Sequence, residues 1–259
     1  MKERLAEMTD FPTPAFRTRE LPLRPEALPK VQLEELAVDL WVAPISAVIV
    51  DDVWSAPLTQ DERERAQRFR FEEDKRRFLC GRGALRTLAG GYLGADPAAL
   101  RFVYSEAGKP GLAPEAGHPA LRFNLSHSGD YVLLGFAWGR AVGVDVELVR
   151  KDIEAEQIAR RFFSQREQQD LLSLPASDRI PAFFRCWTRK EAYVKATGEG
   201  LGLPLNQFDV AFLPGKPAAL LATRPDPAEA LHWVMHDIDL GQAYAAAAIV
   251  GSFAQPIET

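Results

Sequence analysis

The segment Arg140–Leu148, with the sequence RAVGVDVEL, decides the fold because apolar and acidic side chains alternate along it. Successive side chains of a β-strand point to opposite faces, so Asp145 and Glu147 share the face opposite to the valines. Two carboxylates on one face lie about 6 to 7 Å apart, and in a cleft they repel each other unless a cation is present. Mg²⁺ suits such a pair because it takes oxygen ligands and completes its shell with water and phosphate oxygens. The alternative is that this face is the solvated side of an edge strand.

A second motif, Cys186–Lys195 with the sequence CWTRKEAYVK, has helical spacing. In a helix, Trp187, Glu191 and Lys195 follow one another at i, i+4 and lie on one face. A solvent-exposed Glu–Lys pair of this kind stabilises a helix by only about 0.3 to 0.5 kcal/mol. The indole on the same face instead indicates partial burial, where a charged pair needs a functional reason.

Two loops carry groups that can bind phosphate. The GKP sequence at 108–110 places Lys109 between a glycine and Pro110, where its ammonium could meet a phosphate as a point charge. The sequence FNLSHSG at 123–129 brings together amide, hydroxyl and imidazole groups, including Ser126 and His127. An ordinary polar turn has the same composition, and neither loop matches a Walker A or GxGxxG pattern.

The remaining pattern indicates an α+β protein. Prolines at 12, 14, 22, 25 and 29 predict that the first thirty-five or so residues form a loosely tethered extension. Alternating apolar residues predict strands within 38–42, 47–50, 100–104, 121–125, 131–138, 140–148 and 244–250. Helical periodicity predicts helices within 61–86, 153–172 and 181–196.

A weak internal similarity suggests two related halves. Residues 77–94 laid without gaps on residues 185–202 share five identities in eighteen positions, although helices that end in glycine caps resemble each other by chance. A true repeat predicts two pseudo-symmetric α/β halves that meet near residue 140, with the active site at their interface. We therefore expect a proline-rich extension over 1–35, an N-terminal half over 36–140 and a C-terminal half over 141–259.

Composition narrows the class of protein. The 259 residues carry a net charge of −5, so the basic footprint of a nucleic-acid-binding protein is absent overall. The two cysteines, Cys80 and Cys186, are far apart, which excludes a disulfide scaffold or a thiolate zinc site and predicts reduced thiols. The N-terminus is charged, and no apolar run approaches the 18 or so residues of a membrane span. We expect a soluble cytoplasmic protein that binds neither membrane nor nucleic acid.

The motifs GKP, FNLSHS, GVDVE and WTRKEAYVK, in this order, together resemble the 4'-phosphopantetheinyl transferases, in particular the two-halved Sfp-like type. The resemblance extends from about Asp61 to Phe208, and includes RAQRF at 65–69 and RFFS at 161–164 followed by Glu167. The pair GVDVE and WTRKEAYVK is highly specific, whereas GKP and SHS alone are not.

This resemblance implies Mg²⁺-dependent transfer of phosphopantetheine from coenzyme A to a serine of a carrier protein, with release of adenosine 3',5'-bisphosphate. By similarity, the metal ligands are Asp145, Glu147 and Glu191. Coenzyme A would be bound by Asp145 through the metal and by Arg65, Lys109, Pro110, Ser126, His127 and Lys195. Lys195 and Glu191 are the catalytic candidates, and either Glu191 or a metal-bound water takes the serine proton.

Other basic residues remain open. Arg65 stands where some relatives carry lysine, which keeps the charge but changes the donor geometry. Arg77 and Arg82 could touch the 3'-phosphate or could simply be solvated.

The partner implied is an apo acyl, peptidyl or aryl carrier protein. Because carrier proteins are typically acidic, the basic stretch 63–86 and the helix near 160–166 are candidate docking surfaces. A two-halved chain can supply its own interface and work as a monomer. Two alternatives stay open: a catalytically silent carrier-binding module of the same fold, and a different Mg²⁺ phosphotransferase or nuclease.

Overall fold

The computed structural model describes residues 13–22, 24–46, 54–106, 108–113, 120–224 and 226–252. The N-terminal half contains β1 (Ala15–Glu20), β2 (Ala37–Pro44), α2 (Gln60–Gln67), α3 (Glu72–Leu93), β3 (Phe102–Tyr104), β4 (Pro110–Leu112), β5 (Leu121–Ser128) and β6 (Tyr131–Trp138). The C-terminal half contains β7 (Val142–Leu148), α4 (Ala155–Phe162), α5 (Gln165–Ser173), α6 (Ala176–Thr197), β8 (Phe208–Ala211), β9 (Ala219–Thr223), β10 (Trp233–Asp237) and β11 (Tyr244–Gly251). Short 3-10 helices lie at Pro25–Ala27, Pro97–Ala99, Gly200–Gly202, Leu205–Gln207 and Pro227–His232.

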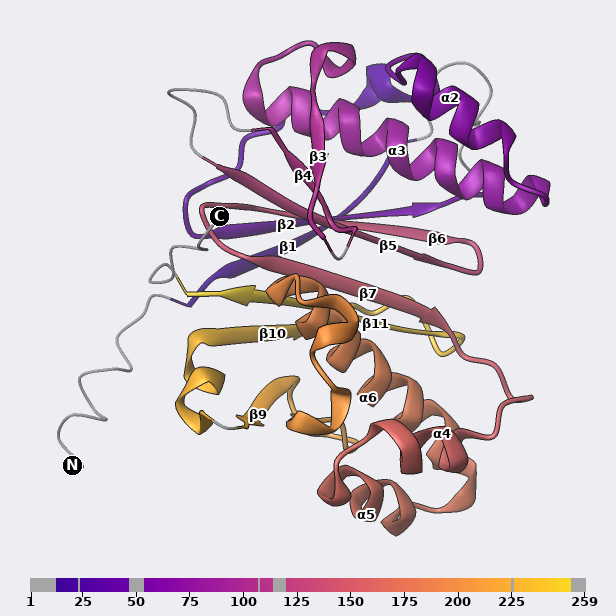
Figure 1. Cartoon of the computed structure of the whole chain (residues 1–259), viewed down its shortest axis with the longest axis vertical. Coiled ribbons are helices and arrows are strands. Elements are labelled where there is room, and N and C mark those ends of the chain that lie inside the picture. The colour runs from indigo at the N-terminus through magenta and orange to yellow at the C-terminus, as the bar shows by residue number, and fades with distance from the viewer. Residues whose placement is uncertain are drawn as a thin grey trace, which may run out of the picture.

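The two halves stack as four layers (Figure 1). The first sheet has the order β1-β2-β6-β5, with β1 parallel to β2 and the other pairs antiparallel. The second sheet is antiparallel, with the order β10-β11-β7. Helices α2 and α3 cover the outer face of the first sheet, and α6 with α4 and α5 lies on the outer side of the second (Figure 1). The expected α+β architecture of two halves is confirmed.

A hydrophobic core lies between the two sheets and joins the halves. Its buried members come from β2, β6, β7, β11 and the segment before β11: Val38, Leu40, Val42, Leu133, Ala137, Val142, Val144, Val146, Ile238, Ala246, Ala248 and Val250. These positions alternate along each strand, as the period of a strand requires. The valines of the GVDVE motif therefore face the other half, which leaves the acidic face of β7 directed toward α6.

The helix expected over 61–86 is interrupted at residues 68–71, so α2 and α3 are separate helices. Thr59 and Glu62 form a capping box that starts α2. The same Glu62 carboxylate accepts hydrogen bonds of 2.6 and 3.0 Å from Arg86 of α3, which fastens α2 against α3. The sequence does not reveal this break, because Phe71, the residue before α3, supplies no side-chain cap that would mark a new helix.

The helix expected over 153–172 is also two helices, α4 and α5. The first ends at Phe162 with Phe163 as its C-cap, and Ser164 caps the second, with Glu167 completing the capping box. The helix expected over 181–196 is present within the longer α6, and β6, β7 and β11 match their predicted strands closely. The strand predicted at 47–50 lies outside the described residues.

The expectation of a loosely tethered N-terminal extension is wrong for residues 15–20. They form β1, which pairs in parallel with β2 from Ala15 to Glu20. An ion pair of 2.5 Å between Arg17 and Glu34 and the buried side chain of Leu21 hold the segment in place. Prolines flank the strand without entering it, so their density in the sequence did not exclude an edge strand.

The two long helices of the halves correspond, but with a different register from that of the sequence alignment. Both α3 and α6 have 22 residues, and left-handed glycines follow them at Gly94 and Gly198. The gap-free alignment pairs Gly94 with Gly202 instead, an error of about one helical turn.

Within the described residues, no helix combines the length and apolarity needed to cross a membrane. Cys80 and Cys186 are buried and free.

Candidate functional site

Gly143 lets α6 lie directly on the acidic face of β7. A Cβ atom at this position would stand 2.0 Å from the carbonyl oxygen of Ala192 and 2.6 Å from the amide nitrogen of Ala196. Asp145 and Glu147 follow at two-residue steps and therefore share the face of Gly143. The absence of a side chain at residue 143 thus brings Glu191 and Lys195 of α6 opposite the two carboxylates.

Asp145 is the centre of a hydrogen-bonded cluster between the halves. Its Oδ1 accepts bonds from Lys195 Nζ at 2.6 Å and from Ser126 Oγ at 2.8 Å. The Lys195 ammonium also donates to Ser126 Oγ at 2.9 Å. Because Ser126 belongs to β5 and Asp145 to β7, the cluster joins the two sheets. Asp145 is only 3% exposed, so these interactions are little weakened by solvent.

Glu147 and Glu191 lie close enough to Asp145 for their charges to interact. Partial burial raises the pKa of the Glu191 carboxyl, and the negative charges of Asp145 and Glu147 raise it further, against the effect of Lys195. Partial burial and the charge of Asp145 likewise raise the pKa of Glu147, although Ser128 donates a 2.8 Å hydrogen bond to it. The three predicted metal ligands therefore form one electrostatically crowded acidic group.

The donor set suits a hard cation. Asp145 Oδ2 is buried and has no hydrogen-bond partner among the described residues, and the two glutamates are destabilised in their charged form. However, the described part of the chain has no group of three or more His, Cys, Asp and Glu side chains arranged as a ready-made metal cage. Mg²⁺ does not require such a cage, since it commonly binds through one or two carboxylates together with water and substrate phosphates.

Lys109 reaches from the N-terminal half to the end of α6. Its Nζ donates to the carbonyl oxygen of Ala196 at 3.2 Å, where the negative end of the helix dipole lies. Burial, with a contribution from the positive charge of Arg122, lowers the pKa of Lys109 to about 8. An anion bound beside this ammonium would favour its charged form.

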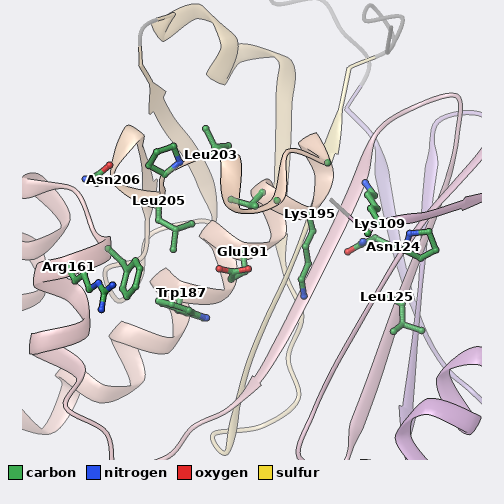
Figure 2. A pocket seen from close by; sticks show the side chains of 17 residues that line it. Lys109, Asn124, Leu125, Arg161, Trp187, Glu191, Lys195, Leu203, Leu205 and Asn206 are labelled. Atoms are coloured by element: carbon green, nitrogen blue, oxygen red, sulfur yellow. The ribbon is translucent and has the colours of Figure 1, made fainter. Parts of the chain in front are cut away.

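A pocket of about 680 Å³ opens between the two halves (Figure 2). Figure 2 shows Glu191 and Lys195 in its middle, Lys109 and Asn124 on one side, and Arg161 on the opposite side. The described residues that line it are Gly108, Lys109, Pro110, Asn124, Leu125, Arg161, Phe162, Trp187, Glu191, Val194, Lys195, Gly198, Gly200, Leu203, Pro204, Leu205 and Asn206. The expected interface between halves therefore does contain a cleft with cations and a carboxylate.

Four basic residues considered from the sequence lie away from the pocket lining. Arg65 is exposed on α2, with its guanidinium 5.4 Å from the centre of the Phe78 ring. Arg82 is neither solvated nor free, because it is buried in a 2.7 Å ion pair with Glu62. Arg77 donates a 2.9 Å bond to the Gly129 carbonyl in the β5–β6 turn.

His127 is the fourth of these residues, and its side chain is exposed on the face of β5 opposite to Ser126 and Ser128, which bind the acidic cluster. Partial desolvation, together with the positive charges of Lys195 and Arg77, lowers the pKa of His127.

Sequence patterns missed the wall formed by residues 203–206 and the pocket position of Arg161 and Phe162. The buried Lys190 holds that wall, since its Nζ donates to the carbonyl oxygens of Leu205 and Phe208 at 2.7 and 2.6 Å. Lys190 also forms a 2.8 Å ion pair with Glu167. Lys190, which precedes Glu191 in the WTRKEAYVK motif, was the residue that could have indicated this wall. The sequence did not show which way its side chain points.

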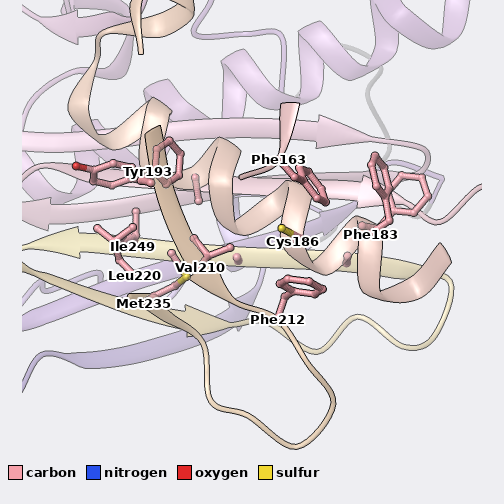
Figure 3. Packing of buried hydrophobic residues seen from close by; sticks show 14 of the residues in the cluster. Phe163, Phe183, Cys186, Tyr193, Val210, Phe212, Leu220, Met235 and Ile249 are labelled. Carbon is pink, nitrogen blue, oxygen red and sulfur yellow. The ribbon is translucent and has the colours of Figure 1, made fainter. Parts of the chain in front are cut away.

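A second hydrophobic core fixes α6 beneath the pocket (Figure 3). Phe163 stacks on Phe183 with ring centres 5.2 Å apart, and Phe183 in turn stacks on Trp187 at 5.8 Å. Figure 3 shows Cys186, Phe212 and Val210 among the same side chains. Trp187 lies at the edge of this core, and Glu191 and Lys195 follow it at four-residue steps on α6, which holds them at fixed positions.

Comparison with known proteins gives a consistent result. The family model for the 4'-phosphopantetheinyl transferase superfamily matches residues 141–249, and the model described as 4'-phosphopantetheinyl transferase, N-terminal, matches residues 52–137. The 4'-phosphopantetheinyl transferase HetI of Nostoc sp. is 42% identical over 194 residues, which cover 74% of this chain and 81% of the relative. A putative 4'-phosphopantetheinyl transferase of Synechocystis sp. is 34% identical over 194 residues, or 75% of this chain and 76% of the relative. The 4'-phosphopantetheinyl transferase Sfp of Bacillus subtilis is 37% identical over 153 residues, or 59% and 66%.

Proposed function

Since this chain belongs to the 4'-phosphopantetheinyl transferase superfamily and is an enzyme of that class, we propose that it modifies a carrier protein with the phosphopantetheine arm of coenzyme A. The carrier serine oxygen forms a bond to the phosphorus that bears pantetheine. The bond from this phosphorus to the bridging oxygen of the pyrophosphate breaks, and adenosine 3',5'-bisphosphate leaves. The serine proton must pass to a base. The observation that carries the proposal is that Lys109 from the N-terminal half and Glu191 and Lys195 from α6 converge on one cleft, with Asp145 bonded to Lys195 outside the lining.

Phosphoryl transfer depends mainly on positioning and charge neutralisation, and this site has residues for both. Asp145, Glu147 and Glu191 would hold Mg²⁺, which when bound neutralises negative charge on the pyrophosphate. The Lys195 ammonium donates to Asp145 Oδ1 in this structure, and it lies in the site where it can also donate to the same phosphates. Lys109 binds from the other side, and the described Asn124 and Pro110 line that wall with it.

Glu191 is the best base for the serine hydroxyl among the carboxylates. It lines the pocket, whereas Asp145 is buried and bonded to Lys195. The apolar walls at Phe162, Trp187 and Leu203 suit the pantetheine arm, which has no charge.

We further propose that the carrier approaches over Arg161 and Phe162. In the basic stretch 63–86, Arg63 is bonded to backbone carbonyls, Arg77 to a turn, and Arg82 and Arg86 to Glu62. Other arginines of this stretch, Arg65, Arg68, Arg70 and Arg76, are exposed but do not line the pocket. Arg161 is both exposed and part of the lining of the pocket into which the acceptor serine must reach. Arg161→Glu should therefore raise the KM for the carrier at least about tenfold, an effect of charge reversal at a contact, and leave the KM for coenzyme A nearly unchanged. If Arg65→Glu raises the carrier KM and Arg161→Glu does not, the carrier docks on α2 instead.

The decisive experiment incubates the purified protein with coenzyme A, Mg²⁺ and a panel of apo acyl, peptidyl and aryl carrier proteins, and weighs each carrier. A mass gain of one phosphopantetheine arm that EDTA abolishes supports transfer and its metal requirement. A carrier that binds without gaining mass favours the silent module. Consumption of another phosphate ester or of nucleic acid, without use of coenzyme A, favours a different phosphotransferase or nuclease.

Location and oligomeric state stay predictions. The free, buried Cys80 and Cys186 support a reducing compartment such as the cytoplasm. Because both walls of the pocket come from one chain, we propose that the monomer is active, which sedimentation at assay concentrations can test.

A further inference from the structure

A row of polar side chains on β5 replaces the backbone ladder that is missing between the two sheets. One edge of β7 pairs with β11, and its other edge faces β5, with which it forms no ladder in the described structure. The amides of Val144, Val146 and Leu148 point to this second edge. They donate to Asn124 Oδ1 at 2.9 Å, Ser126 Oγ at 3.4 Å and Ser128 Oγ at 3.1 Å. We call Asn124, Ser126 and Ser128 the polar seam.

The two serines of the polar seam also bind the acidic side chains of the site. Each hydroxyl accepts from a β7 amide and uses its single proton to donate to the carboxylate of the preceding β7 residue. Ser126 donates to Asp145 Oδ1, and Ser128 donates to Glu147 Oε2, both at 2.8 Å. Asn124 holds the third amide but has no carboxylate beside it.

We propose that Ser128 is a positioning residue of the cation site, because it fixes one oxygen of Glu147 and leaves the other free for the metal. The Leu148 amide donates to the Ser128 hydroxyl, so this hydroxyl is held in place relative to the strand that carries Glu147. A substitution of Ser126 would not test the same role alone, because the Ser126 hydroxyl also accepts a hydrogen bond from Lys195. This role rests on the proposed function, since it concerns the same Mg²⁺ site.

Binding of Mn²⁺, followed by electron paramagnetic resonance with coenzyme A at saturation, tests the role without use of turnover. Ser128→Ala should raise the Kd for Mn²⁺ by about 10- to 100-fold, the usual effect of losing an outer-sphere hydrogen bond to a metal ligand. Ser128→Thr keeps the hydroxyl and should bind Mn²⁺ nearly as the wild type does. If the alanine variant does not fold, Ser128→Cys serves in its place, because a thiol is a weak donor and should raise the Kd in the same direction.

Two controls separate positioning from simple stability. Ser46→Ala also removes a serine hydroxyl that binds a carboxylate, that of Asp130, and should leave the Kd for Mn²⁺ unchanged. In a double-mutant cycle, Ser128→Ala should raise the Kd much less in a Glu147→Gln background than in the wild type.

Equal Mn²⁺ affinity of folded Ser128→Ala and the wild type would overturn the role of Ser128 and leave the transferase proposal intact. A wild type that binds no Mn²⁺ in the presence of coenzyme A would remove the proposed cation site itself.

Discussion

Asp145 is the residue on which the proposed transfer depends most. Asp145→Ala should lower kcat/KM by more than about 100-fold, since changes in the outer sphere of a metal alone cost about 10- to 100-fold. The fold should survive because Lys195, whose side chain is 30% exposed, can turn to solvent when its partner is lost. Mass spectrometry of the carrier measures the activity, and circular dichroism checks the fold. Wild-type turnover in this variant would exclude Asp145 from the site.

Lys195 should act on coenzyme A rather than on stability. Lys195→Ala removes a cation from the pocket, so we expect a higher KM for coenzyme A and a lower kcat. The comparison variant Lys216→Ala removes an exposed lysine from the same half and should change neither constant. Unchanged kinetics of Lys195→Ala would mean that its ammonium serves only to pair with Asp145.

Glu62 should make the free energy of unfolding depend on pH in the acidic range. Burial would raise its pKa, but the hydrogen bonds from Arg86 and Thr59 and the charges of Arg82 and Arg86 outweigh burial and hold the pKa below the usual 4.5. The unfolded chain then binds more protons, so the contribution of Glu62 is present above about pH 4.5 and is lost as the pH falls through the lowered pKa.

Glu62→Gln tests this contribution through the free energy of unfolding, measured by urea titration at several pH values. The difference between wild type and variant should shrink as the pH falls below about 4.5. The exposed neighbour variant Glu64→Gln should show no such trend. A difference that stays constant across this pH range would contradict the prediction.

Single residues of the site were the most predictable feature of this molecule. Period two in GVDVE and period four in WTRKEAYVK placed Asp145, Glu147, Glu191 and Lys195 correctly relative to their own elements. Their meeting depends on Gly143, whose closeness to α6 no local pattern contains. The spacing within RAQRF did not show where Arg65 lies, because α2 ends at Gln67 and Arg65 stays outside the pocket lining.

At the scale of elements, Lys190 connects α6 to α5 and to the pocket wall. Lys190→Met should lower the free energy of unfolding by about 3 to 5 kcal/mol, because Glu167 is left buried without its partner. Adding Glu167→Gln should recover part of this loss, and Lys216→Met should have almost no effect. Chemical denaturation measures all three, and a loss below about 1 kcal/mol would contradict the role of Lys190.

Element boundaries were harder to predict than element types. The break at Ser164 depends on a capping box whose Glu167 also binds a distant basic residue, Lys190, whereas the break at residues 68–71 has no side-chain cap at Phe71. Apolar periodicity carries no information about such capping contacts or about their long-range partners. For the same reason β1 was missed, since its pairing with β2 is nonlocal.

At the scale of the whole molecule, the core between the sheets should make the two halves unfold together. Strands β2 and β6 contribute to both the N-terminal core and the shared core, and β7 and β11 link the shared core to the C-terminal half. We expect coincident urea transitions by far-ultraviolet circular dichroism and tryptophan fluorescence. Leu40→Ala truncates a side chain in the shared core and should lower the free energy of unfolding by about 2 to 5 kcal/mol. It should shift both transitions equally. Two separated transitions would show that the halves are independent.

Trp187 lies in the pocket wall, whereas Trp41 and Trp54 are fully enclosed elsewhere. An indole in such a position senses the polarity of whatever fills the space beside it. Because the half-buried Trp138 and Trp233 also emit, the part of an emission change that Trp187→Phe abolishes is the optical gauge of occupancy. Candidate acceptors can then be ranked by titration without dyes or radiolabels.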